Sequence, residues 1–276
     1  MAYLSRIPIA PLREGARRFL KSPQAMHAAV QGAVAWHTEP GRTLWRVDAD
    51  TPHRPYLYAV TQIQPDWTHL TEQAGWLIDD PSVKPAIADY TPLLAQLAAG
   101  QEYAFRLTAS PVQNTKTPHK MSPNQMRIAA EAEAQDKRRR GFRLGQHTAK
   151  HQLAWLTNKA RKHGFELREL PAQAPAVPSI LPLIDPPDGN LETALDASVT
   201  SSERRVFSKT DTEDGQPVLK DGKPVRRQVT VQTATFSGTL RVTEPVDLAR
   251  TLLSGMGPAK AYGCGLLTLA PLPEKA

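Results

Sequence analysis

The first hundred residues carry hydrophobic positions at two different periods, one typical of strands and one typical of helices. Alternating patterns predict strands over Tyr3–Ile9, Thr43–Asp48, Tyr56–Ile63 and, beginning a further one, Trp76–Ile78. Apolar residues at helical spacing predict helices over residues 23–37 and 66–74. Ser22 is a favourable cap for the first helix, and Pro23 is favourable at its first position. The predicted order is β-α-β-β-α-β.

The same order can be traced a second time, starting near residue 101. The predicted strands of this second unit are Tyr103–Ala109, Phe165–Leu170, Arg204–Thr210, Val225–Val242 and Gly265–Ala270. Its predicted helices cover His147–His163 and Pro245–Ser254. Residues 111–146 form a long polar and basic stretch, which we expect to be mobile. Residues 171–190 contain six prolines, which exclude a regular element there.

Two units with this element order predict an α+β fold of two tandem ferredoxin-like (RRM-like, βαββαβ) domains, over residues 1–98 and 99–276. A hydrophobic content of 40% excludes a fully disordered chain. The sequence contains no apolar run of about 18 residues, so we expect no membrane span and no membrane partner. Cys264 is the single cysteine, which rules out an internal disulfide and favours a cytoplasmic protein. We expect neither a metal site nor a cofactor.

The net charge of +7 comes from the middle of the chain. Residues 101–170 carry 14 basic and 6 acidic side chains, which suits a polyanionic partner; a solubilising surface is the alternative. The residues of this segment expected to contact phosphates are Lys137, Arg138, Arg139, Arg140, Arg143 and Lys150. A smaller basic group on the predicted hairpin either contacts phosphates or is a charged edge strand that prevents aggregation; it contains Lys209, Arg226 and Arg227.

A glycine-rich loop near the carboxyl end is the most informative stretch. Its glycines allow positive φ angles and a close approach of the backbone to a ligand; they are Gly255, Gly257, Gly263 and Gly265. Successive N–H groups in such a loop can cradle phosphate oxygens, and Lys260 would add a positive charge. The loop follows a helix and lacks Gly-Lys-Ser/Thr, so it is not a Walker A loop. A tight helix-to-strand connection is the alternative.

His27 is the candidate for proton transfer. It follows Met26 on the predicted helix, about 100° round from the apolar stripe, so its imidazole lies at the edge of the buried face. A histidine titrates at about pH 6.5 and can act as a general base or acid. The alternative, for any one of the eight histidines, is an ordinary surface residue.

The loop sequence GMGPAKAYGCGLL, from Gly255 to Leu267, resembles the C-terminal signature of the CasE family. These proteins are the CRISPR repeat-cleaving endoribonucleases of the type I-E Cascade complex. Shorter matches follow in the family's order along nearly the whole chain, apart from the proline-rich insertion: Tyr3–Ile7, Ser22–His27, Leu44–Val47, Phe105–Pro111, Leu153–Leu156, Val231–Gln232 and Phe236–Leu240. The C-terminal motif is specific to the family. The shorter matches are weak singly, but together they support the resemblance because they follow in the family's order.

The resemblance implies a tandem ferredoxin-like fold and metal-independent cleavage of a CRISPR repeat stem-loop RNA at the 3′ base of its stem. The products would be a 2′,3′-cyclic phosphate and a 5′-hydroxyl. The enzyme would then stay on its product with the other type I-E Cascade subunits. In this scheme His27 takes the proton of the 2′-hydroxyl, and Lys260 or the glycine-loop amides hold the phosphorane oxygens.

Two positions depart from the family pattern. Several members carry a tyrosine three residues before the histidine, where this chain has Gln24. Some carry a basic residue one turn after it, where this chain has Gln31 and Gly32. Gln24 cannot serve as a phenolic acid, so the general acid is unassigned. Two other hypotheses stay open: an RNA-binding subunit of the same fold that does not cut, and an unrelated enzyme whose glycine loop binds a small phosphorylated ligand.

Overall fold

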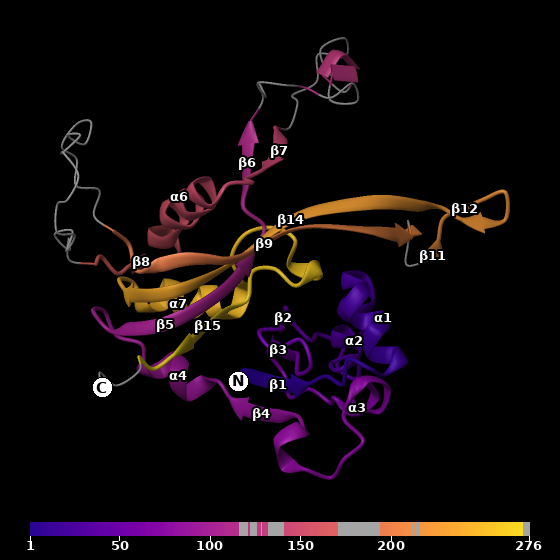
Figure 1. Ribbon diagram of the computed structural model, residues 1–276, viewed down its shortest axis with the longest axis horizontal. Coiled ribbons are helices and arrows are strands. Elements are labelled where there is room, and N and C mark those ends of the chain that lie inside the picture. The colour runs from indigo at the N-terminus through magenta and orange to yellow at the C-terminus, as the bar shows by residue number, and fades with distance from the viewer. Residues whose placement is uncertain are drawn as a thin grey trace, which may run out of the picture.

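The computed structural model describes most of the chain as two units, each built around an antiparallel sheet (Figure 1). The described residues are 1–115, 121, 126–127, 129–131, 141–170, 194–210, 212–213 and 216–272. The proline-rich stretch lies outside them. So do four of the cations that the sequence analysis assigns to phosphate binding, namely Lys137, Arg138, Arg139 and Arg140.

The first unit is a four-stranded sheet with helices against it. In chain order its elements are β1 (Tyr3–Pro8), α1 (Glu14–Lys21), α2 (Pro23–Gly32), β2 (Leu44–Asp48), β3 (Tyr56–Thr61), α3 (Thr68–Ala74), η1 (Pro81–Val83), β4 (Ala86–Asp89) and α4 (Thr91–Gln96). The strand order is β2-β3-β1-β4, and every neighbouring pair is antiparallel. Strand β1 therefore lies inside the sheet, between β3 and β4.

The two faces of this sheet bury different side chains, because successive residues of a strand point to opposite faces. Ile7, Trp45 and Ala59 belong to a buried cluster that they share with helices α1, α2 and α3. Leu44 and Val60 belong to a different cluster, which consists mainly of residues from the second unit. The first sheet is therefore covered by its own helices on one face and by the second unit on the other.

The second unit is larger and contains a long hairpin. In chain order its elements are β5 (Glu102–Ala109), β6 (Val112–Thr115), β7 (Phe142–Gly145), α6 (Ala149–Ala160), η2 (Arg161–His163), β8 (Phe165–Leu167), β9 (Ala197–Thr210), β10 (Thr212–Glu213), β11 (Gln216–Pro217), β12 (Leu219–Lys220), β13 (Lys223–Pro224), β14 (Arg226–Val242), α7 (Pro245–Ser254), η3 (Lys260–Tyr262) and β15 (Leu267–Ala270). The main strand order is β15-β5-β14-β8, and β9 pairs with β14. The β9–β14 hairpin runs past this sheet and above α1 (Figure 1).

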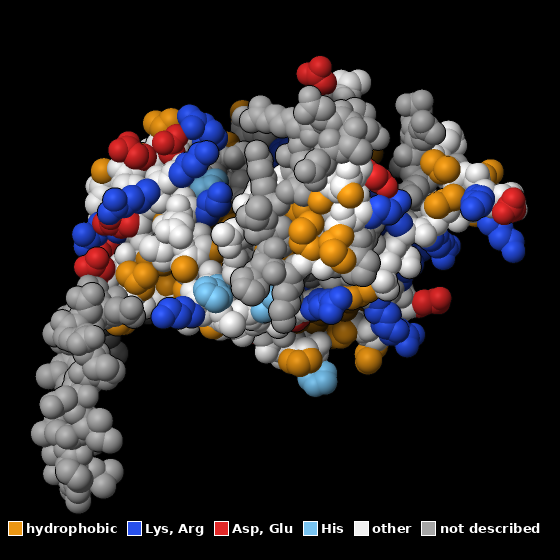
Figure 2. Space-filling view, turned by 90° about the horizontal axis from the view of Figure 1, so that it is seen from above, with side chains coloured by type: hydrophobic (Ala, Val, Ile, Leu, Met, Phe, Trp, Pro, Cys, Tyr) orange, Lys and Arg blue, Asp and Glu red, His pale blue; other side chains and the backbone are white. Residues whose placement is uncertain are grey.

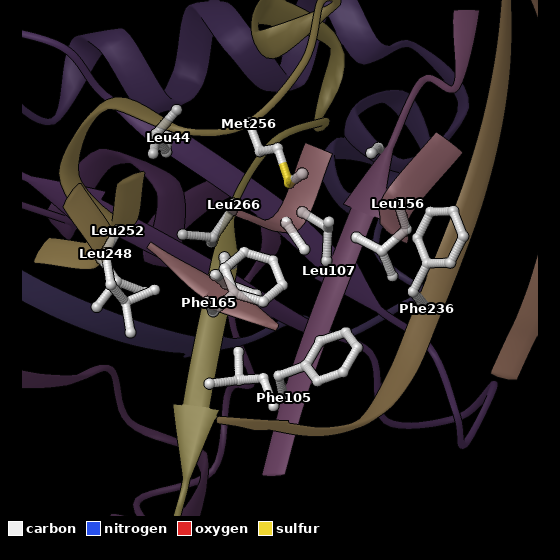
Figure 3. Close-up of a cluster of buried hydrophobic side chains, with 14 of the residues drawn as sticks. Leu44, Phe105, Leu107, Leu156, Phe165, Phe236, Leu248, Leu252, Met256 and Leu266 are labelled. Atoms are coloured by element: carbon white, nitrogen blue, oxygen red, sulfur yellow. The ribbon is translucent and has the colours of Figure 1, made fainter. Parts of the chain in front are cut away.

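A shared hydrophobic core joins the two units. Leu44 of β2 lies near Met256 and Leu266, which belong to the segment between α7 and β15 (Figure 3). All three side chains are fully buried. Close packing of this kind allows little relative movement, so it fixes the position of the glycine-rich segment relative to the first unit.

Several elements of the first unit differ from the sequence-based prediction, and α4 is among those that the pattern misses. The helix predicted over 23–37 ends at Gly32. The sequence pattern misses α1, in which Ala16 and Phe19 are the buried residues. The strand predicted to begin at Trp76–Ile78 is wrong, because that segment is a loop and β4 forms after the prolines instead. Every side chain of β4 is exposed, so this strand has no buried face to produce an alternating pattern.

In the second unit the predicted elements are confirmed, most of them with shifted ends. The helix Pro245–Ser254 has the predicted bounds, since Pro245 begins it and Gly255 follows its last residue. Strand β9 begins at Ala197 rather than at Arg204, which makes the hairpin longer than predicted. Both ends of the basic stretch over 111–146 form strands, β6 and β7, which pair antiparallel, so the expectation of a mobile stretch does not hold at these ends.

Candidate active site and nucleic-acid interface

Helix α2 holds His27 at the edge of its buried face. The Ser22 hydroxyl accepts a hydrogen bond from the Ala25 N–H at 3.2 Å, and Pro23 occupies the first turn. The cap and the proline fix where the helix begins. Met26 is fully buried in the core beside it, whereas His27 is half-buried. The sequence-based placement of His27 at the stripe's edge is confirmed.

The surroundings of His27 favour a neutral imidazole. Its Nδ1 atom is buried and has no hydrogen-bond partner among the described residues. Burial, and next the positive charge of Lys209, lower the pKa of His27 below its ordinary value. A neutral imidazole can accept a proton at physiological pH. Because Nδ1 is enclosed, Nε2 is the nitrogen left to meet a substrate.

Lys260 lines the same hollow as His27, which we call the His27 pocket. The pocket has a volume of about 440 Å³ and is formed by three segments: His27 and Gln31 of α2, Gly41, Arg42 and Thr43 before β2, and Lys260 and Ala261 of η3. Burial, and next the charge of Arg42, lower the pKa of Lys260. Three of the lining side chains can carry positive charge, and none of these lining residues is acidic.

The conformation of the loop explains its glycines. The loop residues with positive φ are Gly255 (75°), Gly257 (77°), Gly263 (79°) and Gly265 (93°), together with Ala259 (62°). A Cβ atom on Gly263 would lie 2.8 Å from the Trp45 ring, and one on Gly255 would lie 2.7 Å from the Leu44 side chain. These positions therefore need glycine both for φ and for close packing against β2.

Two of the loop's glycine amides are already used within the chain. The Gly265 N–H donates to the backbone oxygen of Thr108 at 2.7 Å, and the Gly255 N–H donates to that of Thr251 at 2.8 Å. Both glycines are buried. The expectation that loop amides hold phosphate oxygens therefore does not apply to these two, for which the tight helix-to-strand connection is the better description. Lys260 is the charged loop residue that lines the pocket.

A second hollow, which we call the Arg143 groove, borders the same loop. It has a volume of about 820 Å³, and its basic side chains are Arg143, Arg204 and His147. Pro258 and Ala259 of the loop also line it. Because the next two loop residues line the His27 pocket, a chain of negative charges lying in the groove would lead directly to the pocket.

The β9–β14 hairpin brings a further cation toward His27. The Phe207 ring of β9 lies edge to face against the Tyr262 ring of η3, with 4.8 Å between centroids. This contact holds the hairpin against the segment that carries Lys260. Lys209, two residues after Phe207, is close enough for its charge to affect the pKa of His27. The structure thus brings Lys209 to the same region as His27.

The other predicted cations are exposed, but they line neither hollow. Arg226 and Arg227 begin β14, far along the hairpin, and Lys150 lies in the first turn of α6. Figure 2 shows Lys and Arg side chains toward both ends of one face, with Asp and Glu side chains among them at each end. Positive charge therefore extends well beyond the pocket.

Arg42 and Thr43 line the pocket, although the sequence analysis does not identify them. Thr43 is only 6% exposed, and its Oγ1 atom has no hydrogen-bond partner within the described part of the chain. Arg42 is exposed. The two residues follow Gly41 and precede a strand, a sequence that matches no motif. Only the folded chain shows that they face His27.

This arrangement suits removal of a proton next to a group that becomes more negative. His27 can accept the proton, and Lys260 and Arg42 can offset the charge that develops. In the described ranges, no three His, Cys, Asp or Glu side chains gather as ligands for a metal ion. Nor is any helix in those ranges long and apolar enough to cross a membrane.

The sequence is similar to CRISPR-associated proteins along almost its whole length. A family model described as "CRISPR associated protein" matches residues 2–271. Over 272 residues the chain is 28% identical to the CRISPR-associated endoribonuclease Cse3 of Thermus thermophilus, covering 98% of this chain and 100% of that protein. Over 77 residues it is 35% identical to the CRISPR system Cascade subunit CasE of Escherichia coli, covering 25% of this chain and 37% of that protein.

The fold is similar to that of a solved relative. The structure of CRISPR endoribonuclease Cse3 bound to 19 nt RNA matches with a TM-score of 0.63 at 25% sequence identity. The match covers 98% of this chain and 98% of that one. Both units described above therefore have counterparts in that structure.

Proposed function

The chain belongs to the family of CRISPR-associated proteins that includes CasE and Cse3, and from this premise we propose that it is an endoribonuclease that cleaves CRISPR repeat RNA. The observation that carries the proposal is that His27 and Lys260, from opposite ends of the chain, line one pocket. RNA brings its own nucleophile, the 2′-hydroxyl next to each phosphate. A protein therefore needs only to align this group, move protons and offset charge.

In the proposed reaction, His27 Nε2 takes the proton of the 2′-hydroxyl beside the scissile phosphate. The 2′-oxygen forms a bond to phosphorus, and the bond between phosphorus and the 5′-oxygen breaks. One product ends in a 2′,3′-cyclic phosphate, and the other ends in a 5′-hydroxyl once its oxygen has taken up a proton. Side chains supply both the proton transfer and the charge stabilisation, so the reaction is metal-independent.

Lys260 is the best placed group to protonate the leaving 5′-oxygen. Gln24, at the position where several relatives of the family carry tyrosine, has no acidic proton to give. Lys260 lies in the pocket with His27, and its lowered pKa makes its ammonium a stronger acid than an exposed lysine. One side chain of the pocket would then accept a proton while another donates one.

We place the RNA stem along the Arg143 groove, with the cleaved link at the 3′ base of the stem in the His27 pocket. A-form RNA is recognised mainly by its shape and its phosphates, which matches a groove lined by Arg143 and Arg204. Lys209 would add a phosphate contact close to the pocket. Further phosphate contacts would come from Arg226 and Arg227 of the hairpin, Lys150 of α6 and the arginine-rich stretch Lys137–Arg140.

The architecture proposed for this activity is two tandem ferredoxin-like domains, residues 1–98 and 99–276. The supporting observation is that both sheets have the same strand order, β4-β1-β3-β2 in the first unit and β15-β5-β14-β8 in the second. In each, the strand that is last along the chain lies beside the first. The similarity to CasE supports retention of the enzyme on its product as a Cascade subunit.

A single incubation tests the proposal against the non-cleaving alternative, which Gln24 favours. Purified protein is mixed with its cognate repeat stem-loop RNA in EDTA, and cleavage and binding are measured together. We expect cleavage by the wild-type protein, loss of cleavage with retained binding in His27→Ala, and wild-type behaviour in His53→Ala, which changes an exposed histidine elsewhere. Binding without cleavage by the wild-type protein would establish the alternative, and absence of binding would overturn both.

A further inference from the structure

We propose that Arg42 and Thr43, together with Lys260, form the site that holds the scissile phosphate in the His27 pocket. This inference rests on the proposed function and extends it to two residues that lie in no recognised motif. They belong to the segment that leads into β2, whereas His27 belongs to α2 and Lys260 to η3. The phosphate would therefore be held by residues of two segments, and His27 of the third segment would lie next to the attacking 2′-hydroxyl.

The first observation is the charge of the pocket. Arg42 and Lys260 line it together, and Arg42 is close enough to lower the pKa of Lys260. Gln31, the other α2 residue in the lining, is neutral, and no acidic side chain is among the lining residues to pair with either cation. Two like charges held in one hollow repel each other, and an anion bound between them relieves that repulsion.

The second, independent observation is the Thr43 hydroxyl. Thr43 is 6% exposed, and its Oγ1 has no hydrogen-bond partner in the described part of the chain. Buried hydroxyl groups are normally hydrogen-bonded, so one left without a partner at a pocket wall needs an explanation. Thr43 lines the pocket, so in this proposal its hydroxyl would rotate toward the cavity when RNA binds, and a phosphate oxygen would accept its hydrogen bond.

The backbone carrying these residues is firmly placed. Leu44, the next residue, is fully buried in the core that both units share. The segment is thus anchored directly after Thr43, which contributes to the preorganisation that transition-state stabilisation requires.

The chemistry matches the reacting group. As the 2′-oxygen attacks, negative charge builds up on the two non-bridging oxygens of the phosphate. A guanidinium can donate two parallel hydrogen bonds to these oxygens, and the Thr43 hydroxyl can donate one more. His27 of α2, which lines the same pocket, would take the proton of the attacking hydroxyl.

The test measures single-turnover cleavage of a stem-loop RNA with the host's CRISPR repeat sequence, at saturating protein. Arg42→Ala should slow cleavage by about 100-fold, as expected for loss of one preorganised donor, and change RNA affinity much less. Arg42→Lys should recover part of the rate. The matched control is Arg54→Ala, which removes an exposed arginine at the opposite end of β2 and should cleave at the wild-type rate.

Thr43→Val distinguishes a functional from a structural role of the Thr43 hydroxyl, because valine has the same shape without the hydroxyl. It should slow cleavage by about tenfold and raise the melting temperature, since an unpaired buried hydroxyl is removed. Thr43→Ser should keep the wild-type rate. A merely structural role predicts the reverse, a lower melting temperature with a proportionate loss of active protein.

The decisive readout is the effect of sulfur on the reaction. RNA is prepared with each phosphorothioate isomer at the scissile phosphate, because sulfur accepts a hydrogen bond more weakly than oxygen. The wild-type protein should cleave one isomer more slowly, and Thr43→Val should cleave the two isomers at similar rates. An unchanged ratio in Thr43→Val, or wild-type rates in both Arg42→Ala and Thr43→Val, would overturn the inference while His27-dependent cleavage still supports the proposed function. No cleavage by the wild-type protein would overturn the function itself, and this inference with it.

Discussion

Arg46 of β2 donates a hydrogen bond to the backbone oxygen of Leu266 at 3.1 Å, so a side chain of the first unit satisfies a backbone acceptor of the second. The same guanidinium donates to the backbone oxygen of Arg106 at 2.9 Å and to the hydroxyl of Thr268 at 3.0 Å. Its remaining bonds go to the two carboxylate oxygens of Asp48, at 2.6 and 2.9 Å. With only 2% of Arg46 exposed, this network fixes β2 relative to β5 and β15.

Arg46→Ala should therefore lower the free energy of unfolding by about 3 kcal/mol, because it removes a buried guanidinium that donates to two backbone oxygens, to the Thr268 hydroxyl and to both oxygens of Asp48. Urea denaturation followed by tryptophan fluorescence measures the change. Arg54→Ala, which removes an exposed arginine from the turn after β2, should change the unfolding free energy by less than about 0.5 kcal/mol. A loss below about 1 kcal/mol in Arg46→Ala would show that the network adds little stability.

Cleavage should persist below the usual titration range of histidine. A general base must be neutral, and burial and Lys209 lower the pKa of His27 from 6.5. A lower pKa keeps the imidazole neutral at more acidic pH, so the acidic limb of kcat/KM against pH should have its midpoint below 6.5. A midpoint above that value would contradict His27 as the neutral base.

The contribution of Lys209 to this midpoint can be tested separately. Lys209→Gln removes a positive charge that disfavours the imidazolium, so the midpoint should move to higher pH. Lys223→Gln removes the same charge from an exposed site at the far end of the hairpin and should leave the midpoint at the wild-type value. Equal shifts in the two variants would mean that net charge, rather than the position of Lys209, sets the pKa.

The sequence predicts elements well where their boundaries are marked locally. Pro245 and Gly255 bracket α7, and its predicted bounds are confirmed. The edge strand β4 has only exposed side chains, so no pattern marks it. Arg46 shows a different limit. Its place in a strand follows from the sequence, but its burial depends on Leu266, a partner hundreds of residues away.

The same limit applies to the candidate site. His27 can be chosen from its place on an amphipathic helix, and Lys260 from its place in a glycine-rich loop. The sequence around neither residue predicts that they share a pocket, because it is the core formed by both units that brings them together. Arg42 and Thr43 have no local signal and become visible only through that long-range packing.

RNA binding should weaken steeply with salt, and the Arg143 groove should account for part of the slope. Each phosphate contact that is lost reduces the slope of log affinity against log salt by about one. We expect that change for Arg143→Ala and again for Arg204→Ala, measured by titration of repeat RNA at several salt concentrations. Lys84→Ala, an exposed lysine beside β4, should leave the slope unchanged. If it lowers the slope as much as Arg143→Ala does, binding is diffuse and the groove is not the RNA path.

The loop requires glycine at position 263 both for its backbone angle and for its packing against Trp45. The φ of Gly263 is 79°, and a Cβ atom would lie 2.8 Å from the Trp45 ring. Gly100 provides the matched control, because its φ is 84° and nothing lies within 4 Å of a Cβ placed there. Both alanine variants carry the same backbone strain, about 1 kcal/mol, but only Gly263→Ala must also displace a ring.

Gly263→Ala should therefore lose about 2 kcal/mol more stability than Gly100→Ala, a difference typical of overpacking. It should also slow cleavage, because the displaced loop carries Lys260 away from His27, whereas Gly100→Ala should cleave at the wild-type rate. Urea denaturation and single-turnover cleavage of repeat RNA measure the two effects. Equal stability losses in the two variants would mean that the ring yields easily, and that positive φ alone explains the glycine at this position.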